Sequence, residues 1–176
     1  MKIKSLQEER MKITLLGDSI RKIGYGPLVP SLLGDDFEVY QPEDNCRFSK
    51  FTLRGLWDIC DVFGDGPFST PDEYCQNMLR IADILLARHE KVIFATTTPV
   101  NPLHPYNRNE RIIEYNRLIV PLLEEKGILI NDLHALVVPH VDEYIREDLI
   151  HLTDAGARAC AQQTTCIIRE AAKTLR

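Results

Sequence analysis

The sequence of 176 residues predicts a single α/β domain in which helices cover both faces of a mostly parallel sheet. Short β-rich apolar runs alternate with long amphipathic segments, and no repeat or low-complexity run interrupts them. With 44% hydrophobic and 27% charged residues, the composition is that of an ordinary globular chain. A chain of this length buries about 70% of its unfolded surface around one core, which leaves little room for a second domain. We therefore predict one domain over residues 1–176, with residues 1–10 as a candidate N-terminal extension.

The first two predicted elements are strands. The apolar run 11–16 stops abruptly at Gly17, which is typical of a buried strand that ends in a turn. The run 37–40 is rich in β-forming residues and is closed by Pro42, so it is predicted as the second strand.

The middle of the chain predicts a helix followed by a strand. The segment 71–88 carries apolar residues on one helical face, Ser69 or Thr70 can cap it, and Pro71 suits its first position. The run 91–98 is the clearest strand in the sequence, because β-branched and aromatic residues dominate it.

The last third predicts a helix, a strand and a final helix. The segment 109–126 has helical periodicity, and Gly127 is placed to end it. The apolar run 128–133 then predicts a strand. The final helix is expected to be capped by Thr153 and to run to about Leu175.

This alternation implies right-handed crossovers and parallel strands, with the active site at the carboxyl ends of the strands. Between residues 52 and 70 the scheme requires a buried central strand. The apolar run in that region is 56–63, and two acidic residues interrupt it. The central third strand is therefore predicted to be either missing or replaced.

Charge and cysteine content exclude several functional classes. A net charge of −5 and a pI near 5.5 argue against nucleic-acid binding, which requires a concentrated basic surface. Neither a secretory signal nor a stretch of membrane-spanning length is visible, so we expect a cytoplasmic protein without membrane contact. The five cysteines form no CxxC pair, so neither a disulfide framework nor a thiolate zinc site is predicted, and we expect no metal.

Three residues stand out as candidates for nucleophilic catalysis. Ser19 follows Gly17 and Asp18 at the turn that ends the first strand, where its hydroxyl would be exposed at the functional edge of the sheet. Asp148 precedes His151 by three residues, a spacing that lets the carboxylate hold the ring while the other ring nitrogen faces a serine. Each motif alone is common in ordinary turns, and the hypothesis depends on their occurring together.

These motifs resemble a known superfamily. The segment 17–20, Gly-Asp-Ser-Ile, and the segment 148–156, Asp-Leu-Ile-His-Leu-Thr-Asp-Ala-Gly, are similar to the first and last signature blocks of the SGNH, or GDSL-like, hydrolases. Four intervening segments resemble one bacterial branch of that superfamily: 45–49, 52–56, 92–100 and 114–116. The similarity extends over nearly the whole domain.

The resemblance implies a flavodoxin-like three-layer α/β/α sandwich and ester hydrolysis without a metal or cofactor. Ser19 would attack the acyl carbonyl, His151 would move the proton, and Asp148 would stabilise the imidazolium. The oxyanion would be held by the backbone amides of Ser19 and of Cys46, with Asn45 as a candidate side-chain donor.

The sequence departs from the family in the third block, which places an asparagine after the central strand. A strand-length piece with that asparagine is missing before Leu56. Either the protein lacks it, or the sequence is incomplete there, or residues 56–63 occupy its place. Asn77 is a further candidate substitute for the asparagine, whereas Asn131 follows a later strand and is in the wrong order.

Several other polar residues are candidates for the substrate pocket. His104, His134 and His140 fall in or near loops at the predicted active-site edge. Arg47 and Arg54 can bind a substrate anion, but surface pairing with Asp44 or Glu43 is the favoured interpretation.

Three functional hypotheses remain. The first is an esterase or deacetylase that acts on a small-molecule or carbohydrate ester. The second is a catalytically weak or inactive protein of the same fold that binds an acylated or glycosylated ligand. The third is a flavodoxin-like nucleotide or flavin binder, although residues 20–26 lack the glycine spacing of a phosphate-binding loop. The sequence does not predict an oligomeric state.

Overall fold

The computed structural model describes residues 10–43, 69–88 and 91–175. The described elements are β1 (Met11–Thr14), η1 (Ile20–Tyr25), η2 (Gly26–Leu28), α1 (Val29–Leu33), β2 (Phe37–Tyr40), α3 (Pro71–Leu86), β3 (Ile93–Ala95), α4 (Asn109–Glu125), β4 (Leu129–Asn131), α5 (Leu133–Val137), η3 (Val138–His140), α6 (Val141–Tyr144) and α7 (Asp154–Lys173). Among these, no helix has both the length and the apolar character needed to cross a membrane.

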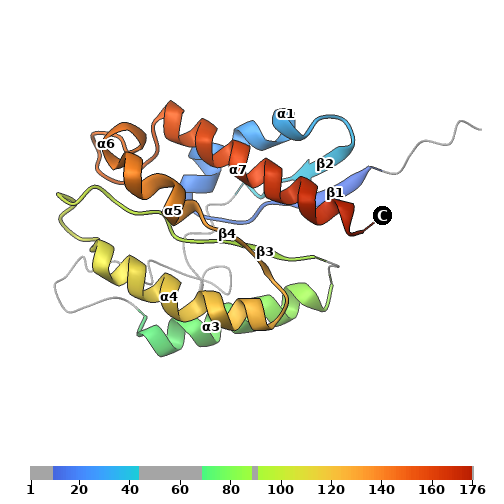
Figure 1. Cartoon of the computed structure of the whole chain (residues 1–176), viewed down its shortest axis with the longest axis horizontal. Coiled ribbons are helices and arrows are strands. Elements are labelled where there is room, and N and C mark those ends of the chain that lie inside the picture. Colours follow the sequence, from blue (N-terminus) through green and yellow to red (C-terminus); the bar gives the residue numbers. More distant parts are fainter. Residues whose placement is uncertain (1–9, 44–68, 89–90, 176) are drawn as a thin grey trace, which may run out of the picture.

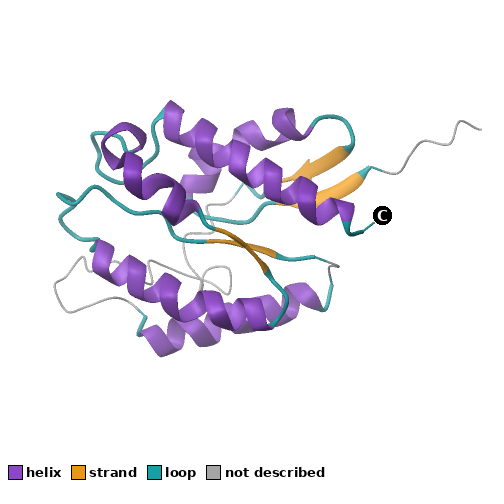
Figure 2. Ribbon diagram, in the orientation of Figure 1, coloured by secondary structure: helices purple, strands orange, loops and turns teal. Residues whose placement is uncertain are grey.

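The elements form three layers, as predicted. Figures 1 and 2 show the strands between a layer that contains α1 and α7 and a layer that contains α3 and α4. The fold is therefore α/β with helices on both faces of parallel strands.

The strands form two parallel pairs. In the first, Met11 lies opposite Phe37 and Thr14 opposite Tyr40. In the second, β3 pairs with β4 in parallel. Within the described ranges no strand joins β1 to β3, and the predicted substitute for the central strand, 56–63, lies outside those ranges.

Each face of the strands has its own hydrophobic cluster. One cluster packs α7 and the short helices against the strands; its buried members are Tyr25, Val29, Leu33, Leu133, Val137, Ile145, Leu152, Ala157, Cys160, Ala161 and Ile168. The other packs α3 against α4; its buried members are Tyr74, Ala82, Tyr115, Ile119, Leu123 and Ile128. Because both clusters lie against strands, they fix the strand ends that carry the candidate site.

The helix ends follow the predicted local chemistry. Thr70 and Glu73 form a reciprocal capping box at the start of α3, so Thr70 and not Ser69 is the cap. Thr153 caps α7 by accepting the backbone N–H of Gly156. Gly127 adopts a φ of 76° just after α4, the left-handed conformation that ends many helices.

Truncation of a buried side chain in the cluster between α3 and α4 should lower the stability of the fold. The Ile119 side chain is 0% exposed on α4, so we expect Ile119→Ala to lower the free energy of unfolding by about 2–5 kcal/mol. Ile113 on the same helix is 50% exposed, and Ile113→Ala should change stability far less. Urea denaturation of both variants measures the difference, and equal losses would contradict the packing described here.

Candidate active site

The structure places Ser19 in a tight turn immediately after β1. Gly17 begins the turn with a φ of 156°. A Cβ atom at this position would lie 2.9 Å from Arg21 Cβ, so any larger residue at position 17 would force the turn or Arg21 to move. The Asp18 carboxylate accepts the backbone N–H of Ile20 at 2.9 Å, and the Asp18 carbonyl accepts the N–H of Lys22. Ser19 itself has helical φ and ψ at the start of η1, and its side chain makes no capping hydrogen bond. The Ser19 hydroxyl therefore remains available for other contacts.

Asp148 and His151 lie in a second tight turn, between α6 and α7. The N–H of Arg146 donates to the carbonyl of His151 at 2.7 Å and closes the turn. Leu149, with a φ of 69°, adopts a left-handed conformation that is unfavourable for a leucine. Its N–H donates to the Arg146 carbonyl, and its carbonyl accepts the N–H of Asn101. Contacts on both sides thus hold this turn in one conformation.

The two turns bring together the three residues that the sequence singled out. His151 Nε2 lies 2.9 Å from Ser19 Oγ, and His151 Nδ1 lies 2.9 Å from Asp148 Oδ2. When Nδ1–H donates to the carboxylate, Nε2 is left as the acceptor that faces the serine hydroxyl. This arrangement can remove the proton from the serine as its oxygen attacks an electrophile.

Hydrogen bonds to the Asp148 carboxylate favour its ionised form. Partial desolvation acts to raise its pKa, but the N–H groups of His151 and Ile150 together with the His151 ring lower the pKa to about 2. Asp148 Oδ1 accepts those two N–H groups, which leaves Oδ2 for the imidazole. One carboxylate therefore both builds the turn and orients the ring.

A second carboxylate, that of Asp18, lies close to the same histidine. Asp18 is exposed as a whole residue, but many protein atoms surround its carboxyl group. The resulting desolvation raises the pKa of Asp18. The N–H groups of Ile20 and Arg21 and the charges of His151 and Arg21 act in the opposite direction.

A loop after β3, held by its own hydrogen bonds, contacts the turn that carries Asp148. The N–H of Asn101 donates to the carbonyl of Leu149, and the side chain of Asn109 both accepts the N–H of Val100 and donates to its carbonyl. His104 Nδ1 accepts the N–H groups of two neighbouring residues, Tyr106 and Asn107. Desolvation lowers the pKa of His104, while the charge of Asp148 acts to raise it.

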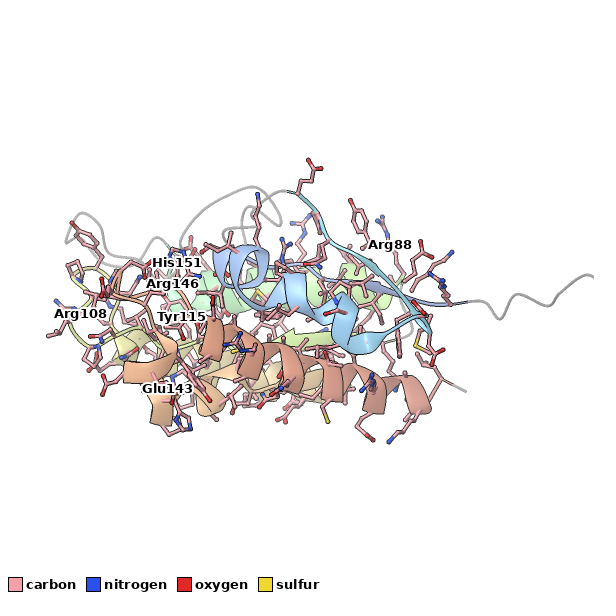
Figure 3. All side chains as sticks on the ribbon, turned by 90° about the horizontal axis from the view of Figure 1, so that it is seen from above. Arg88, Arg108, Tyr115, Glu143, Arg146 and His151 are labelled. Atoms are coloured by element: carbon pink, nitrogen blue, oxygen red, sulfur yellow. The ribbon has the colours of Figure 1, made fainter. Side chains whose placement is uncertain are left out.

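The other two predicted pocket histidines have different surroundings. His134 lies on α5, where desolvation lowers its pKa and Asp132 acts to raise it. His140 is exposed, stacks on the ring of Tyr144 and lies 3.8 Å from the Glu143 carboxylate. Figure 3 shows His151 and Arg146 at the same end of the molecule as Arg108, with Arg88 toward the opposite end.

Of the predicted oxyanion groups, only Ser19 lies within the described residues. Cys46 and Asn45 lie outside the described ranges, as do Arg47 and Arg54. Asn131 is buried and its side-chain amide bonds to Thr164 and Gln163 on α7, consistent with its exclusion on sequence order. Asn77 lies on α3, and its amide nitrogen is buried without a hydrogen-bond partner among the described atoms.

Two asparagines hold the loop that follows β3, a role that the sequence did not predict. Asn116 accepts the N–H of Thr97 and donates to its carbonyl from α4, and Asn109 does the same to Val100. Both amides pair with backbone that no sequence spacing identifies in advance. In the described part of the chain, no three His, Cys, Asp or Glu side chains are grouped so that they could hold a metal ion.

Known structures share this fold. No protein-family model and no curated protein matches the sequence. An acetyl xylan esterase superimposes with a TM-score of 0.73 and 19% identity, covering 90% of this chain and 100% of its own. A lipase/acylhydrolase from Enterococcus faecalis gives 0.69 and 18%, covering 91% and 96%. A GDSL-like lipase from Bacteroides thetaiotaomicron gives 0.66 and 15%, covering 91% and 88%. A catalytic mutant of an acetylxylan esterase from Geobacillus stearothermophilus, in which alanine replaces a serine, gives 0.71 and 18%, covering 93% and 94%. The chain therefore has the fold of GDSL-like hydrolases, as its sequence predicted.

Proposed function

We propose that the protein is a serine hydrolase that cleaves ester bonds, with Ser19 as nucleophile, His151 as general base and acid, and Asp148 as the group that orients His151. The observation that carries the proposal is the pair of 2.9 Å contacts from the two ring nitrogens of His151, one to Ser19 and one to Asp148. Ser19 and His151 are 132 residues apart in the sequence, so the contact is a product of the fold. The similar structures described as esterases and lipases support the same chemistry.

The proposed reaction proceeds through an acyl-enzyme. Ser19 Oγ forms a bond to the acyl carbon while His151 Nε2 accepts the hydroxyl proton, and Asp148 stabilises the resulting imidazolium. The tetrahedral intermediate collapses when His151 returns the proton to the leaving alcohol. Water then attacks the acyl carbon and gives up a proton to His151. The second tetrahedral intermediate collapses as His151 gives that proton to Ser19 Oγ, which releases the acid and restores the Ser19 hydroxyl and the neutral imidazole. The Ser19 backbone amide is the proposed oxyanion donor in both half-reactions.

The substrate is proposed to be a small-molecule or carbohydrate ester. The loop beside the Asp148 turn exposes the side chain of Leu103 by 80% and that of Tyr106 by 47%, although hydrogen bonds within the loop hold its backbone in place. A fixed loop that presents apolar and aromatic surface provides contact area for the alcohol part of an ester or for a sugar ring. The acetyl xylan esterases among the similar structures support a carbohydrate ester.

A fluorophosphonate probe tests the function directly, because it reacts with serines activated by a neighbouring base. We expect one covalent adduct per native protein, located at Ser19 by peptide mass spectrometry, and none after heat denaturation. Ser31 is an exposed serine whose hydroxyl donates to the Leu28 carbonyl, so Ser31→Ala should label normally. Absence of labelling in folded protein would reject the hydrolase and favour the alternative, an inactive protein that binds an acylated or glycosylated ligand. The incomplete third block of the sequence is the observation that keeps this alternative open.

A further inference from the structure

Arg21 is a charged side chain in an unusual place. It lies two residues after Ser19 on η1, and only 3% of its surface is exposed. Arginine is almost never fully buried without partners, and its guanidinium stays charged at any physiological pH. A buried cation this close to the candidate nucleophile therefore requires an explanation from its contacts.

The guanidinium of Arg21 joins the ends of two neighbouring strands. Its Nη2 donates to the Gly17 carbonyl at 3.1 Å, and its Nη1 donates to the Pro42 carbonyl at 3.3 Å. Gly17 begins the nucleophile turn after β1, and Pro42 follows β2. The backbone ladder between these strands extends as far as the bond from the Leu15 N–H to the Tyr40 carbonyl at 2.9 Å. The Arg21 side chain continues the connection beyond that point, where the nucleophile turn begins.

Two glycines make room for this side chain. A Cβ atom on Gly17 would approach Arg21 Cβ to 2.9 Å. A Cβ atom on Gly26 would approach the Arg21 carbonyl oxygen to 2.5 Å and Arg21 Cδ to 2.9 Å. Gln41, which precedes Pro42, donates from its amide to the Gly26 carbonyl and so secures the same segment. The arginine is thus enclosed by the turn whose geometry it helps to hold.

We propose that Arg21 is a positioning residue for Ser19: by binding the carbonyls of Gly17 and Pro42, it fixes the nucleophile turn at the distance from which Ser19 Oγ meets His151 Nε2. The role of Arg21 in turnover rests on the proposed hydrolase function, whereas its effect on the Ser19–His151 contact does not. Displacement of a reacting group by about 1 Å can lower the rate about 100-fold, so a small movement of this turn is sufficient to impair catalysis. Ground-state binding of the substrate involves other surfaces and should be unaffected.

The kinetic test compares Arg21 with Arg169, a second arginine that donates to backbone carbonyls. Arg169 Nη2 reaches the carbonyls of Leu32 at 2.7 Å and Leu33 at 3.3 Å, and so joins α7 to α1. For a short-chain aryl ester we expect Arg21→Gln to lower kcat about 10- to 100-fold with KM within about twofold. Arg169→Gln should keep the wild-type kcat, even if it lowers the melting temperature. Wild-type kcat in folded Arg21→Gln, or an equal loss in both variants, would overturn the proposal.

Arg21→Lys covers the case in which Arg21→Gln does not fold. Lysine keeps the buried positive charge and most of the apolar stem, but a single ammonium cannot span two carbonyls in the geometry of a guanidinium. We expect Arg21→Lys to fold and to show a reduced kcat, while Arg169→Lys remains at the wild-type value. A folded Arg21→Lys with unchanged kcat and KM would contradict the role.

A readout that needs no turnover separates this inference from the proposed function. The ring-proton resonances of His151, assigned with a His151→Asn variant, report its contact with Ser19 and can be followed over a pH titration by NMR. We expect Arg21→Lys to shift these resonances and Arg169→Lys to leave them unchanged. If the wild-type protein neither hydrolyses esters nor labels with a fluorophosphonate, the proposed function fails, yet the histidine resonances still decide whether Arg21 positions Ser19. Unchanged resonances in Arg21→Lys would overturn the positioning role in either case.

Discussion

Ser19→Ala is expected to lower the turnover of a short-chain aryl ester by a factor of about 10⁴ or more. The substitution removes the oxygen that would form the acyl-enzyme and leaves His151 without its 2.9 Å partner. No other side chain is placed to take over the attack among the contacts described for His151. The residual rate should therefore approach that of the bound but uncatalysed reaction.

Ser19→Ala should lower the rate of the chemical step without destabilising the fold. The Ser19 side chain makes no capping hydrogen bond at the start of η1, and the Asp18 carboxylate supplies that contact through the N–H of Ile20. Alanine also tolerates the helical φ of −65° and ψ of −29° at this position. The measurement is kcat at saturating ester for freshly purified protein, with the melting temperature recorded beside it. Ser31→Ala is the matched control, and a Ser19→Ala protein with more than about 1% of wild-type kcat would exclude Ser19 as the nucleophile.

The sequence predicted the larger elements well because their signals are local. Thr70 and Thr153 cap their helices, and Gly127 ends another, through interactions within one turn of chain. β3 is shorter than the apolar run 91–98: its pairing with β4 covers only Ile93–Ala95, and the backbone of Thr97 bonds instead to the Asn116 side chain on α4. The short helices α5 and α6 were not predicted, because four or five residues carry too little periodicity to identify a helix.

The candidate site was predictable to the extent that its chemistry is carried by side chains in short motifs. Ser19, Asp148 and His151 each belong to a recognisable turn: the Ser19 turn follows β1, where parallel topology places functional residues, and the Asp148–His151 turn directly precedes α7. Arg21 was not predicted as part of the site, because its partners are backbone carbonyls and one of them is 21 residues away. Backbone acceptors have no sequence signature, so contacts of this kind become visible only in the folded chain.

Acidification should remove the contribution of Asp148 to stability. Its pKa in the folded protein is about 2, against an ordinary value of 3.8, so the folded state binds the proton less readily than the unfolded state. The stabilisation is therefore complete above about pH 4 and declines as the pH falls toward 2. Because the side chain is partly exposed, solvent screening keeps the effect modest. At neutral pH the carboxylate is fully ionised and available to His151.

Asp148→Asn separates the two roles of this carboxylate. Asparagine retains a carbonyl oxygen that can accept the N–H groups of Ile150 and His151, so the turn should persist. It replaces the second oxygen by an amide that cannot accept from His151 Nδ1–H. The ring is then stabilised as the other tautomer, in which Nε2 carries the proton and cannot take one from Ser19. We expect kcat to fall by a factor of about 10³ to 10⁴ with little change in fold.

The measurement for Asp148→Asn is kcat between pH 5 and pH 9, with the melting temperature at neutral pH. Asp142→Asn is the matched control, because Asp142 is an exposed carboxylate on the neighbouring helix α6. The control should keep both quantities near the wild-type values. If Asp148→Asn kept more than about a tenth of wild-type kcat, the carboxylate would serve the turn alone. The imidazole would then be oriented by the strained backbone around Leu149 and not by the contact to Asp148, and the proposed roles of the three residues would have to be reassigned.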